Sequence, residues 1–309
     1  MQASLGIDPA RIDLVFGPEG HQSGQPQALL RRLTGRDEIE FAERTRSLPI
    51  EDGVHLAARS CLDLAGIAVP EPADVESLTA GDLNRLLMAI LRLNFGPKMD
   101  AVASCRAPGC GQVLEIDLDL DRMLDMSHLH TIKPQARVDF AIGGKACCLE
   151  LAVPRVRDLA AAARNALEGA PGAERLLVER ALVRITPQNG GRPVAAQRAL
   201  VRPEVRERIE AWVLAHDPFA RLGIRAVCPA CGTPAQLAFD PMSFLLARLE
   251  RPRDILDEVD MIATHYSWGE SEILDLPVTR RLAYLARIEA RLAGDRPVRT
   301  VASHRGSAA

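Results

Sequence analysis

Two cysteine motifs decide how this chain folds: Cys105-Arg-Ala-Pro-Gly-Cys110-Gly111 and, much later, Cys228-Pro-Ala-Cys231-Gly232. Cysteines with two to four residues between them can turn both sulfur atoms toward one point, which is the spacing found in zinc-binding motifs. The glycine after each second cysteine can adopt the left-handed backbone that closes such a turn. Each motif is therefore typical of a zinc knuckle.

The similarity of the two motifs continues beyond the cysteines. In both copies the knuckle is followed by alternating apolar residues, as in a half-buried strand, and then by an aspartate suited to cap a helix. From the second cysteine onward, equivalent residues stand 121 positions apart. The sequence thus predicts an internal duplication of knuckle, strand and helix start. The equivalent residues are Leu114, Ile116, Leu118 and Asp119 in the first copy, and Ala235, Leu237, Phe239 and Asp240 in the second.

One knuckle supplies two thiolates, whereas a structural zinc ion takes four ligands in a tetrahedron. We therefore predict that Cys105, Cys110, Cys228 and Cys231 share one structural Zn²⁺, which makes a split zinc ribbon with a long insertion. Four thiolates leave no open position for water, so such an ion is not hydrolytic. The alternative is that both knuckles are metal-free remnants that only pack against their surroundings.

Composition narrows the class of protein. The chain has 309 residues, of which 47% are hydrophobic, so it can fill a core. Its formal charge of −3 and its 4% of aromatic residues argue against coating nucleic acid by bulk charge or by base stacking. No apolar stretch approaches the ~20 residues of a membrane span, and we see no secretory signal. We expect a soluble, cytosolic, globular protein with no membrane association.

Hydrophobic periodicity predicts an α+β fold, with a mainly helical body and short β-hairpins. Thr79 is expected to cap a helix, and a turn at Gly143-Gly144 predicts a hairpin over 137–153. Cys61 falls in an apolar helical stripe that runs from Val54 to Ala65, and we interpret it as a small buried side chain. Other expected elements are extended segments at 12–16 and 27–33 and helices at 157–167, 173–184 and 203–216.

Four regions follow from these patterns. Residues 1–94 form an N-terminal strand and helix region, and 95–251 form the duplicated knuckle body with an inserted hairpin and helices. Residues 252–295 form a C-terminal helical hairpin that we interpret as a docking segment, and 296–309 are expected to be a disordered tail.

The docking segment combines aromatic and basic residues. An apolar stripe opened by Pro252 runs to Tyr266, a capping box is predicted from Ser267 and Glu270, and Pro277 suits the first turn of a last helix. Three interpretations stay open for the arginines of that helix: a solvated face, a helix-turn-helix contact with DNA, or docking to a partner protein. No enzyme motif is found, so we expect no catalytic residues.

Several stretches resemble the T4-type baseplate family, whose members are encoded with contractile phage tails and related contractile injection systems. The most specific lies in the docking segment, and the resemblance covers roughly residues 30 to 290. The chain departs from the family in its longer first knuckle and in having His-Tyr where His-Trp is common. The matching stretches are His265-Tyr266-Ser267-Trp268, Glu272-Ile273-Leu274-Asp275-Leu276-Pro277, Arg280-Arg281, Tyr284-Leu285, Leu33-Thr34-Gly35-Arg36-Asp37-Glu38, Leu78-Thr79-Ala80-Gly81-Asp82 and Leu151-Ala152-Val153-Pro154.

This resemblance implies a structural or assembly component of a baseplate that acts by binding other baseplate or hub proteins, either in the cytoplasm or incorporated in a phage or injection-system particle. The charge of −3 counts against nucleic acid as its partner. Trp268 and Arg281 in particular are expected to contact the partner without supporting the fold of the body. The alternative is a zinc-ribbon and helix-turn-helix regulator that binds nucleic acid. The predicted partner-binding residues are His265, Tyr266, Trp268, Glu272, Leu276, Pro277, Arg280, Arg281 and Tyr284.

Overall fold

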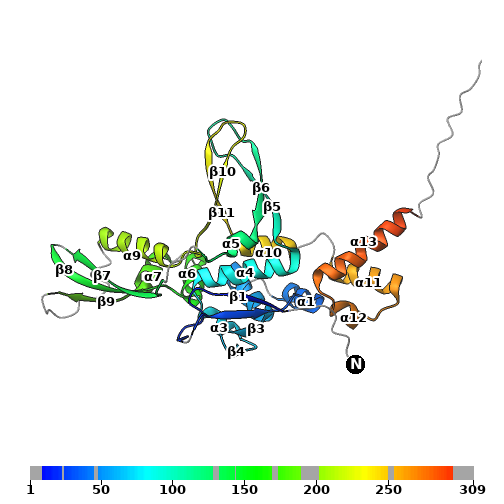
Figure 1. Ribbon diagram of the computed structural model, residues 1–309, viewed down its shortest axis with the longest axis horizontal. Coiled ribbons are helices and arrows are strands. Elements are labelled where there is room, and N and C mark those ends of the chain that lie inside the picture. The colour runs from blue at the N-terminus through cyan, green and yellow to red at the C-terminus, as the bar shows by residue number, and fades with distance from the viewer. Residues whose placement is uncertain are drawn as a thin grey trace, which may run out of the picture.

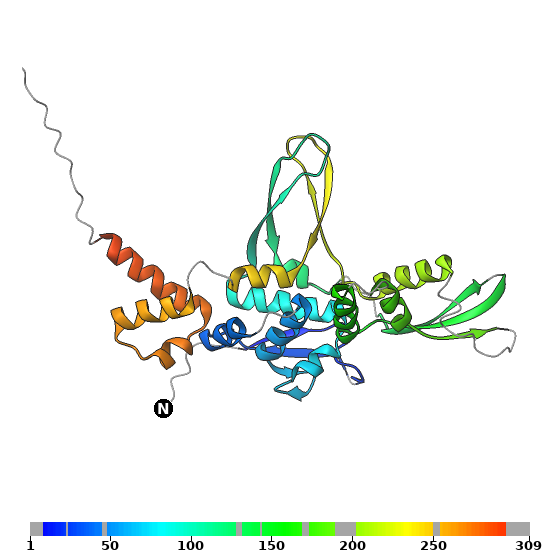
Figure 2. The same cartoon turned by 180° about the vertical axis from the view of Figure 1, so that it is seen from behind.

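The computed structural model describes residues 9–22, 24–44, 48–127, 132–142, 144–168, 173–188, 202–249 and 254–294. A central body carries three projections: a pair of β-hairpins, a lobe of sheet and helices, and a C-terminal group of helices (Figures 1 and 2). Helices and small antiparallel sheets are mixed, which confirms the α+β class. The predicted tail at 296–309 and Pro252 lie outside the described residues.

The central body packs four helices against a four-stranded antiparallel sheet of order β1-β2-β3-β4. The longest of these helices is buried along most of its length, because leucine and isoleucine occur on several of its faces. Its apolar side chains are therefore the centre of the main core. The elements are β1 (Ala10–Asp13), β2 (Gln27–Leu30), α1 (Gly35–Glu43), α2 (Pro49–Ser60), β3 (Cys61–Leu64), β4 (Ile67–Ala68), α3 (Pro72–Glu76) and α4 (Ala80–Phe95).

The helix predicted to continue to Ala65 ends earlier. Helix α2 stops at Ser60, and Cys61 begins β3, which pairs with β2. The three-residue spacing of Cys61 and Leu64 fits a helix, but the turn at Ala65-Gly66, where both residues have positive φ, and the pairing with β2 make this segment a strand. Cys61 is buried as expected, and burial raises the pKa of its thiol to about 12.

Two buried carboxylates hold distant segments at the start of α4. Thr79 caps the helix as predicted, because its hydroxyl accepts the Asp82 amide at 3.2 Å. The Asp82 carboxylate instead accepts the amides of Val15, Phe16 and Gly17 at 2.6 to 2.9 Å. A second carboxylate, Asp217, accepts the Gly81 amide at 3.0 Å. The free amides at this helix end favour negative charge, but burial outweighs them and raises the pKa of both carboxyls.

The predicted duplication is confirmed, and it is longer than expected. Each copy is a hairpin with the cysteine motif at its tip, followed by a helix. Asp119 caps the first helix through the Arg122 amide, and Asp240 bonds the Met242 amide in the second. The strand that precedes each knuckle was not predicted. The elements are β5 (Lys98–Ser104), β6 (Val113–Asp119) and α5 (Leu120–Leu124), then β10 (Leu222–Val227), β11 (Pro234–Phe239) and α10 (Pro241–Leu249).

The insertion between the two copies forms a lobe with its own apolar cluster. The hairpin predicted over 137–153 is confirmed as two strands, and a third strand joins them. Cys147 is buried and Cys148 is half-exposed, because neighbouring side chains of a strand point to opposite faces. The helix expected at 173–184 ends at Ala181, because the next residues pair with β8. The elements are β7 (Gln135–Ile142), β8 (Lys145–Ala152), α6 (Val156–Leu167), α7 (Ala173–Ala181), β9 (Leu182–Pro187) and α9 (Pro203–His216).

The C-terminal module consists of α11 (Ile255–Tyr266), α12 (Glu270–Leu274) and α13 (Val278–Gly294). The predicted capping box of Ser267 and Glu270 is wrong. Ser267 ends α11 with a left-handed backbone (φ 56°), and the Gly269 amide is bonded by the Glu272 carboxylate at 3.0 Å. The capping residues are therefore shifted by two positions along the chain.

The environment of Asp217 predicts a pH-dependent stability. Burial raises the pKa of its carboxyl to about 7, whereas the unfolded chain has an ordinary value near ~4. Between these values the folded protein keeps a proton that the unfolded chain has lost, so its free energy of unfolding falls as the pH rises. Between about pH 5 and about pH 8, the free energy of unfolding of the wild type should fall by roughly 2–3 kcal/mol more than that of Asp217→Asn.

Urea unfolding of both proteins at the two pH values measures this difference. Asp82, whose pKa burial also raises, is present in both proteins, and its charge contributes to the raised pKa of Asp217. Parallel pH profiles for the two proteins would contradict the assignment.

Candidate metal centre

The tips of the two hairpins meet at one point above the central body (Figure 1). Strands β5 and β6 pair in register up to Ser104 and Val113, and β10 and β11 up to Val227 and Pro234. Each cysteine motif is thus the loop that closes a two-stranded hairpin. Two knuckles that are far apart in the sequence therefore face each other.

All four cysteine sulfur atoms lie within 4.8 Å of one another. The Sγ atoms of Cys105 and Cys231 are 3.7 Å apart, and those of Cys110 and Cys228 are 3.8 Å apart. Four sulfurs at ~2.3 Å from a central ion would be separated by ~3.8 Å along each edge of the tetrahedron. The cluster therefore has the size and the donor set to hold one metal ion.

The two knuckles share their backbone geometry as well as their cysteines. The Cys105 amide bonds the Gln112 carbonyl at 2.8 Å, and the Cys228 amide bonds the equivalent Thr233 carbonyl at 3.0 Å. Gly111 and Gly232 have φ of 63° and 69°, a conformation that other residues adopt at a cost. The shorter second motif therefore has the same closing backbone hydrogen bond and the same glycine conformation as the longer first motif.

Burial and hydrogen bonding differ among the four thiols. Cys105 and Cys228 are buried with Leu114 in a small apolar cluster, whereas Cys231 is exposed. The Thr233 hydroxyl, 3.3 Å from the Cys231 sulfur, lowers the pKa of that thiol to about 6. The Ala107 amide lowers the pKa of Cys105, but burial and the neighbouring thiols outweigh it and raise that pKa to about 12. Binding an ion would release protons from the group.

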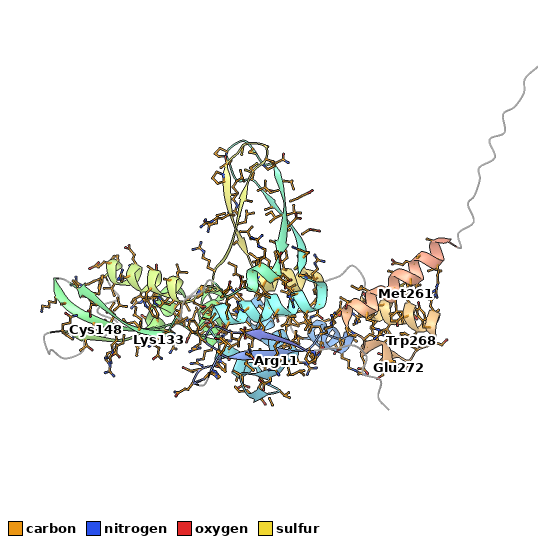
Figure 3. All side chains as sticks on the ribbon, in the orientation of Figure 1. Arg11, Lys133, Cys148, Met261, Trp268 and Glu272 are labelled. Carbon is orange, nitrogen blue, oxygen red and sulfur yellow. The ribbon has the colours of Figure 1, made fainter. Side chains whose placement is uncertain are left out.

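The predicted partner-binding residues divide into exposed, half-buried and buried sets. The half-buried set is an aromatic trio, Tyr266, Trp268 and Tyr284, whose ring centroids lie 4.9 to 5.3 Å apart. Figure 3 places Trp268 in the C-terminal module, away from the hairpin tips. His265, Glu272 and Arg280 form the exposed set, and Leu276, Pro277 and Arg281 form the buried set.

The prediction of partner contact is wrong for Leu276, Pro277 and Arg281, because these side chains are buried inside the protein. Arg281 has no exposed surface and lies between Glu38 of α1 and Glu258 of α11, with N–O distances of 2.7 Å to each. These carboxylates raise the pKa of the guanidinium against the effect of burial. Pro277 and Leu276 are buried where the chain passes from α12 to α13, and Pro277 forms a bridge with Thr34. These residues join the module to the body.

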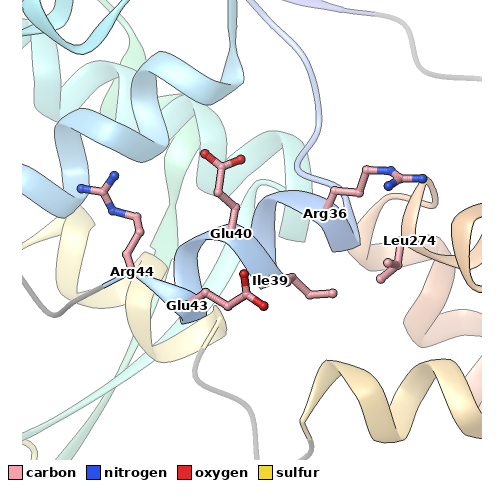
Figure 4. A pocket seen from close by; sticks show the side chains of 6 residues that line it. All are labelled: Arg36, Ile39, Glu40, Glu43, Arg44 and Leu274. Atoms are coloured by element: carbon pink, nitrogen blue, oxygen red, sulfur yellow. The ribbon is translucent and has the colours of Figure 1, made fainter.

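The junction of α1 and α12 leaves a shallow pocket of about 390 Å³ (Figure 4). Its walls are mostly charged, and Arg36, one of the lining residues, donates to Asp275 at 2.5 Å. Close approach of the two helices requires Gly35, because a Cβ there would lie 2.9 Å from Arg281 Nη1 and 3.1 Å from the Leu274 backbone. The lining residues are Arg36, Ile39, Glu40, Glu43, Arg44 and Leu274.

Two residues that contact a predicted site residue were not predicted from the sequence: Thr233 beside Cys231, and Glu258 beside Arg281. Thr233 stands beside the knuckle, but nothing in the spacing of cysteines identifies a hydroxyl that bonds a sulfur. Glu258 had a usable signal, because it occurs on the buried face of the α11 stripe between Ile255 and Ile262. A charge on a buried face requires a partner, and that requirement points to Arg281.

The metal centre predicts that one ion binds per chain and that both knuckles are needed. Cys105→Ser and Cys231→Ser should each remove the ion, because either change leaves three thiolates split between two hairpins. Cys148→Ser, which changes a half-exposed thiol in the lobe, should keep it. Elemental analysis of reduced, purified protein gives the metal content, and half of the metal remaining in either variant would show separate sites.

Because Arg281 is buried between two carboxylates, replacing it should lower the stability of the protein strongly. Arg281→Met leaves Glu38 and Glu258 buried without their counter-ion, which should cost about 3–5 kcal/mol. Arg280→Met changes the exposed neighbour on the same helix. Its free energy of unfolding should stay within about 0.5 kcal/mol of the wild-type value. Chemical denaturation of both variants tests this, and equal stabilities would refute the role given to Arg281.

No helix in the described ranges is long and apolar enough to cross a bilayer. Comparison of the chain with family models, with curated proteins and with solved structures gives no match. The likeness to the T4-type baseplate family therefore remains a prediction from the sequence motifs.

Proposed function

We propose that this chain is a structural or assembly component of the baseplate of a contractile phage tail or contractile injection system. It acts by binding other baseplate proteins, and a structural Zn²⁺ bound by Cys105, Cys110, Cys228 and Cys231 holds its two hairpins together. The observation that carries the proposal is the four-sulfur cluster between the hairpin tips, which serves a scaffold because it leaves no ligand position for substrate.

Zinc is favoured over other metals by the donors. Thiolates select soft or borderline ions, and a tetrahedral set of four suits zinc or an iron–sulfur centre. The sulfur spacings of 3.7 and 3.8 Å fit a single small ion at the centre of the set. The equivalent knuckle turns at Gly111 and Gly232 are those expected of a zinc ribbon.

The ion has a clear structural task. A two-stranded hairpin alone is marginally stable. The hairpin side chains that are fully buried in the main core, Met99, Leu118 and Phe239, lie near the hairpin bases. At their tips the apolar cluster is small, with Leu114 as its largest buried side chain. Ligation would therefore fix the tips relative to each other and make the projection rigid.

The aromatic trio of the C-terminal module is the best surface for a partner. Tyr266, Trp268 and Tyr284 pack against one another and stay half-exposed, so a partner need not pay to order them. Arg291 lies over the Tyr266 ring at 5.7 Å and Arg287 over the Tyr284 ring at 5.9 Å. Tryptophan, tyrosine and arginine are the residues that dominate interface energies. This surface suits a partner with an apolar centre and carboxylates around it.

Co-purification tests the proposal. Full-length tagged chain from cells that assemble the contractile particle should retain hub or wedge proteins, identified by mass spectrometry. Trp268→Ala should weaken that binding at least about tenfold, because it removes the centre of the aromatic surface. Leu256→Ala removes an exposed apolar side chain elsewhere on α11 and is the matched control.

Two results would overturn the proposal. One is the absence of every tail or baseplate protein from the purified sample. The other is a salt-dependent gel shift with DNA that survives in Trp268→Ala, which would favour the nucleic-acid regulator instead.

A further inference from the structure

Strand β7 presents an open edge at the margin of the lobe. The sheet has the order β7-β8-β9, and within the described part of the chain no other strand pairs with β7. Its eight residues pair with β8 without a bulge. The opposite edge, β9, contains Pro187 and borders a register shift at Glu150 and Leu151, which are features that discourage further pairing. The lobe projects from the body (Figure 1), and alternate residues of β7 from Gln135 to Ala141 are exposed.

The backbone groups that face the open edge can be assigned. The Val153 amide bonds the Pro134 carbonyl, which makes that pair a hydrogen-bonded one. Hydrogen-bonded and non-hydrogen-bonded pairs alternate along an antiparallel ladder, so Ala136, Val138 and Phe140 direct their backbone groups to β8. The alternate residues Gln135, Arg137, Asp139 and Ala141 therefore direct theirs outward.

We infer that two copies of this chain associate through β7, antiparallel, about a twofold axis at Val138. This register opposes Arg137 of each copy to Asp139 of the other, and both residues have outward backbone groups, so these pairs are hydrogen-bonded. On the covered face it opposes small Ala136 to Phe140. The interface goes beyond the proposed baseplate role and is independent of the metal centre.

Charge selects this register over its neighbours. An axis at Arg137 would oppose two arginines, and an axis at Asp139 would oppose two aspartates; directly opposed like charges destabilise a sheet. The axis at Val138 gives two opposite-charge pairs instead. Arg137 pairs with Glu150 of its own sheet at 2.9 Å but is still 77% exposed. Asp139 is exposed and has no ion pair among the described residues. A second copy therefore complements the edge in hydrogen bonding, size and charge.

Sedimentation analysis of the full-length reduced protein over a range of concentrations tests the inference. The wild type should be a dimer at micromolar concentration. Arg137→Asp and Asp139→Arg should each raise the dimer dissociation constant at least about tenfold, because each opposes like charges twice. An equimolar mixture of the two variants should recover the dimer, since each variant then faces the charge it lacks.

Arg184→Asp is the matched control. Arg184 also faces Glu150 in the sheet, so its loss removes the same intramolecular contact from the edge away from β7. It should leave the dimer intact. A monomeric wild type, a dimer unaffected by both charge reversals, or a mixture that stays monomeric would each overturn the inference.

Discussion

Four sulfur atoms within 4.8 Å of one another are the constraint on which this structure depends. They come from two hairpins whose bases lie on the central body and whose tips have little apolar surface to bury. Bringing them together closes a loop that contains the whole lobe, and closing a long loop costs conformational entropy. An ion that bound all four thiolates would offset this cost and would fix where the chain leaves for the lobe and where it returns.

Buried polar contacts perform the same task elsewhere in the molecule. Asp82 holds the loop after β1 at the start of α4, and Asp217 holds the segment that leads into the second hairpin. Arg281 joins the C-terminal module to α1 through Glu38. Each contact links segments that are distant in sequence, and each penalises any arrangement that leaves a charge buried without its partner. The projections are thereby held at defined places on the body.

The elements that could be predicted are those that follow local spacing rules. The knuckles, the 121-residue repeat and the Thr79 cap each depend on residues a few positions apart, and the cysteine cluster followed from the four ligands that zinc requires. The predictions that failed concern residues whose contacts are with distant parts of the sequence. Cys61 joined a strand because β2 lies beside it, and Arg281 was assigned to the surface because its carboxylate partners stand 243 and 23 residues away. A charge pattern on one helix does not reveal which face another helix covers.

X-ray absorption at the zinc edge of the protein as purified tests the central claim most directly. A single ion held by both knuckles should show four sulfur neighbours at ~2.3 Å and no nitrogen or oxygen in the first shell. Two sulfurs with two lighter ligands would mean that each hairpin binds metal alone. That result would contradict a shared site, because no ion would then join the two hairpin tips.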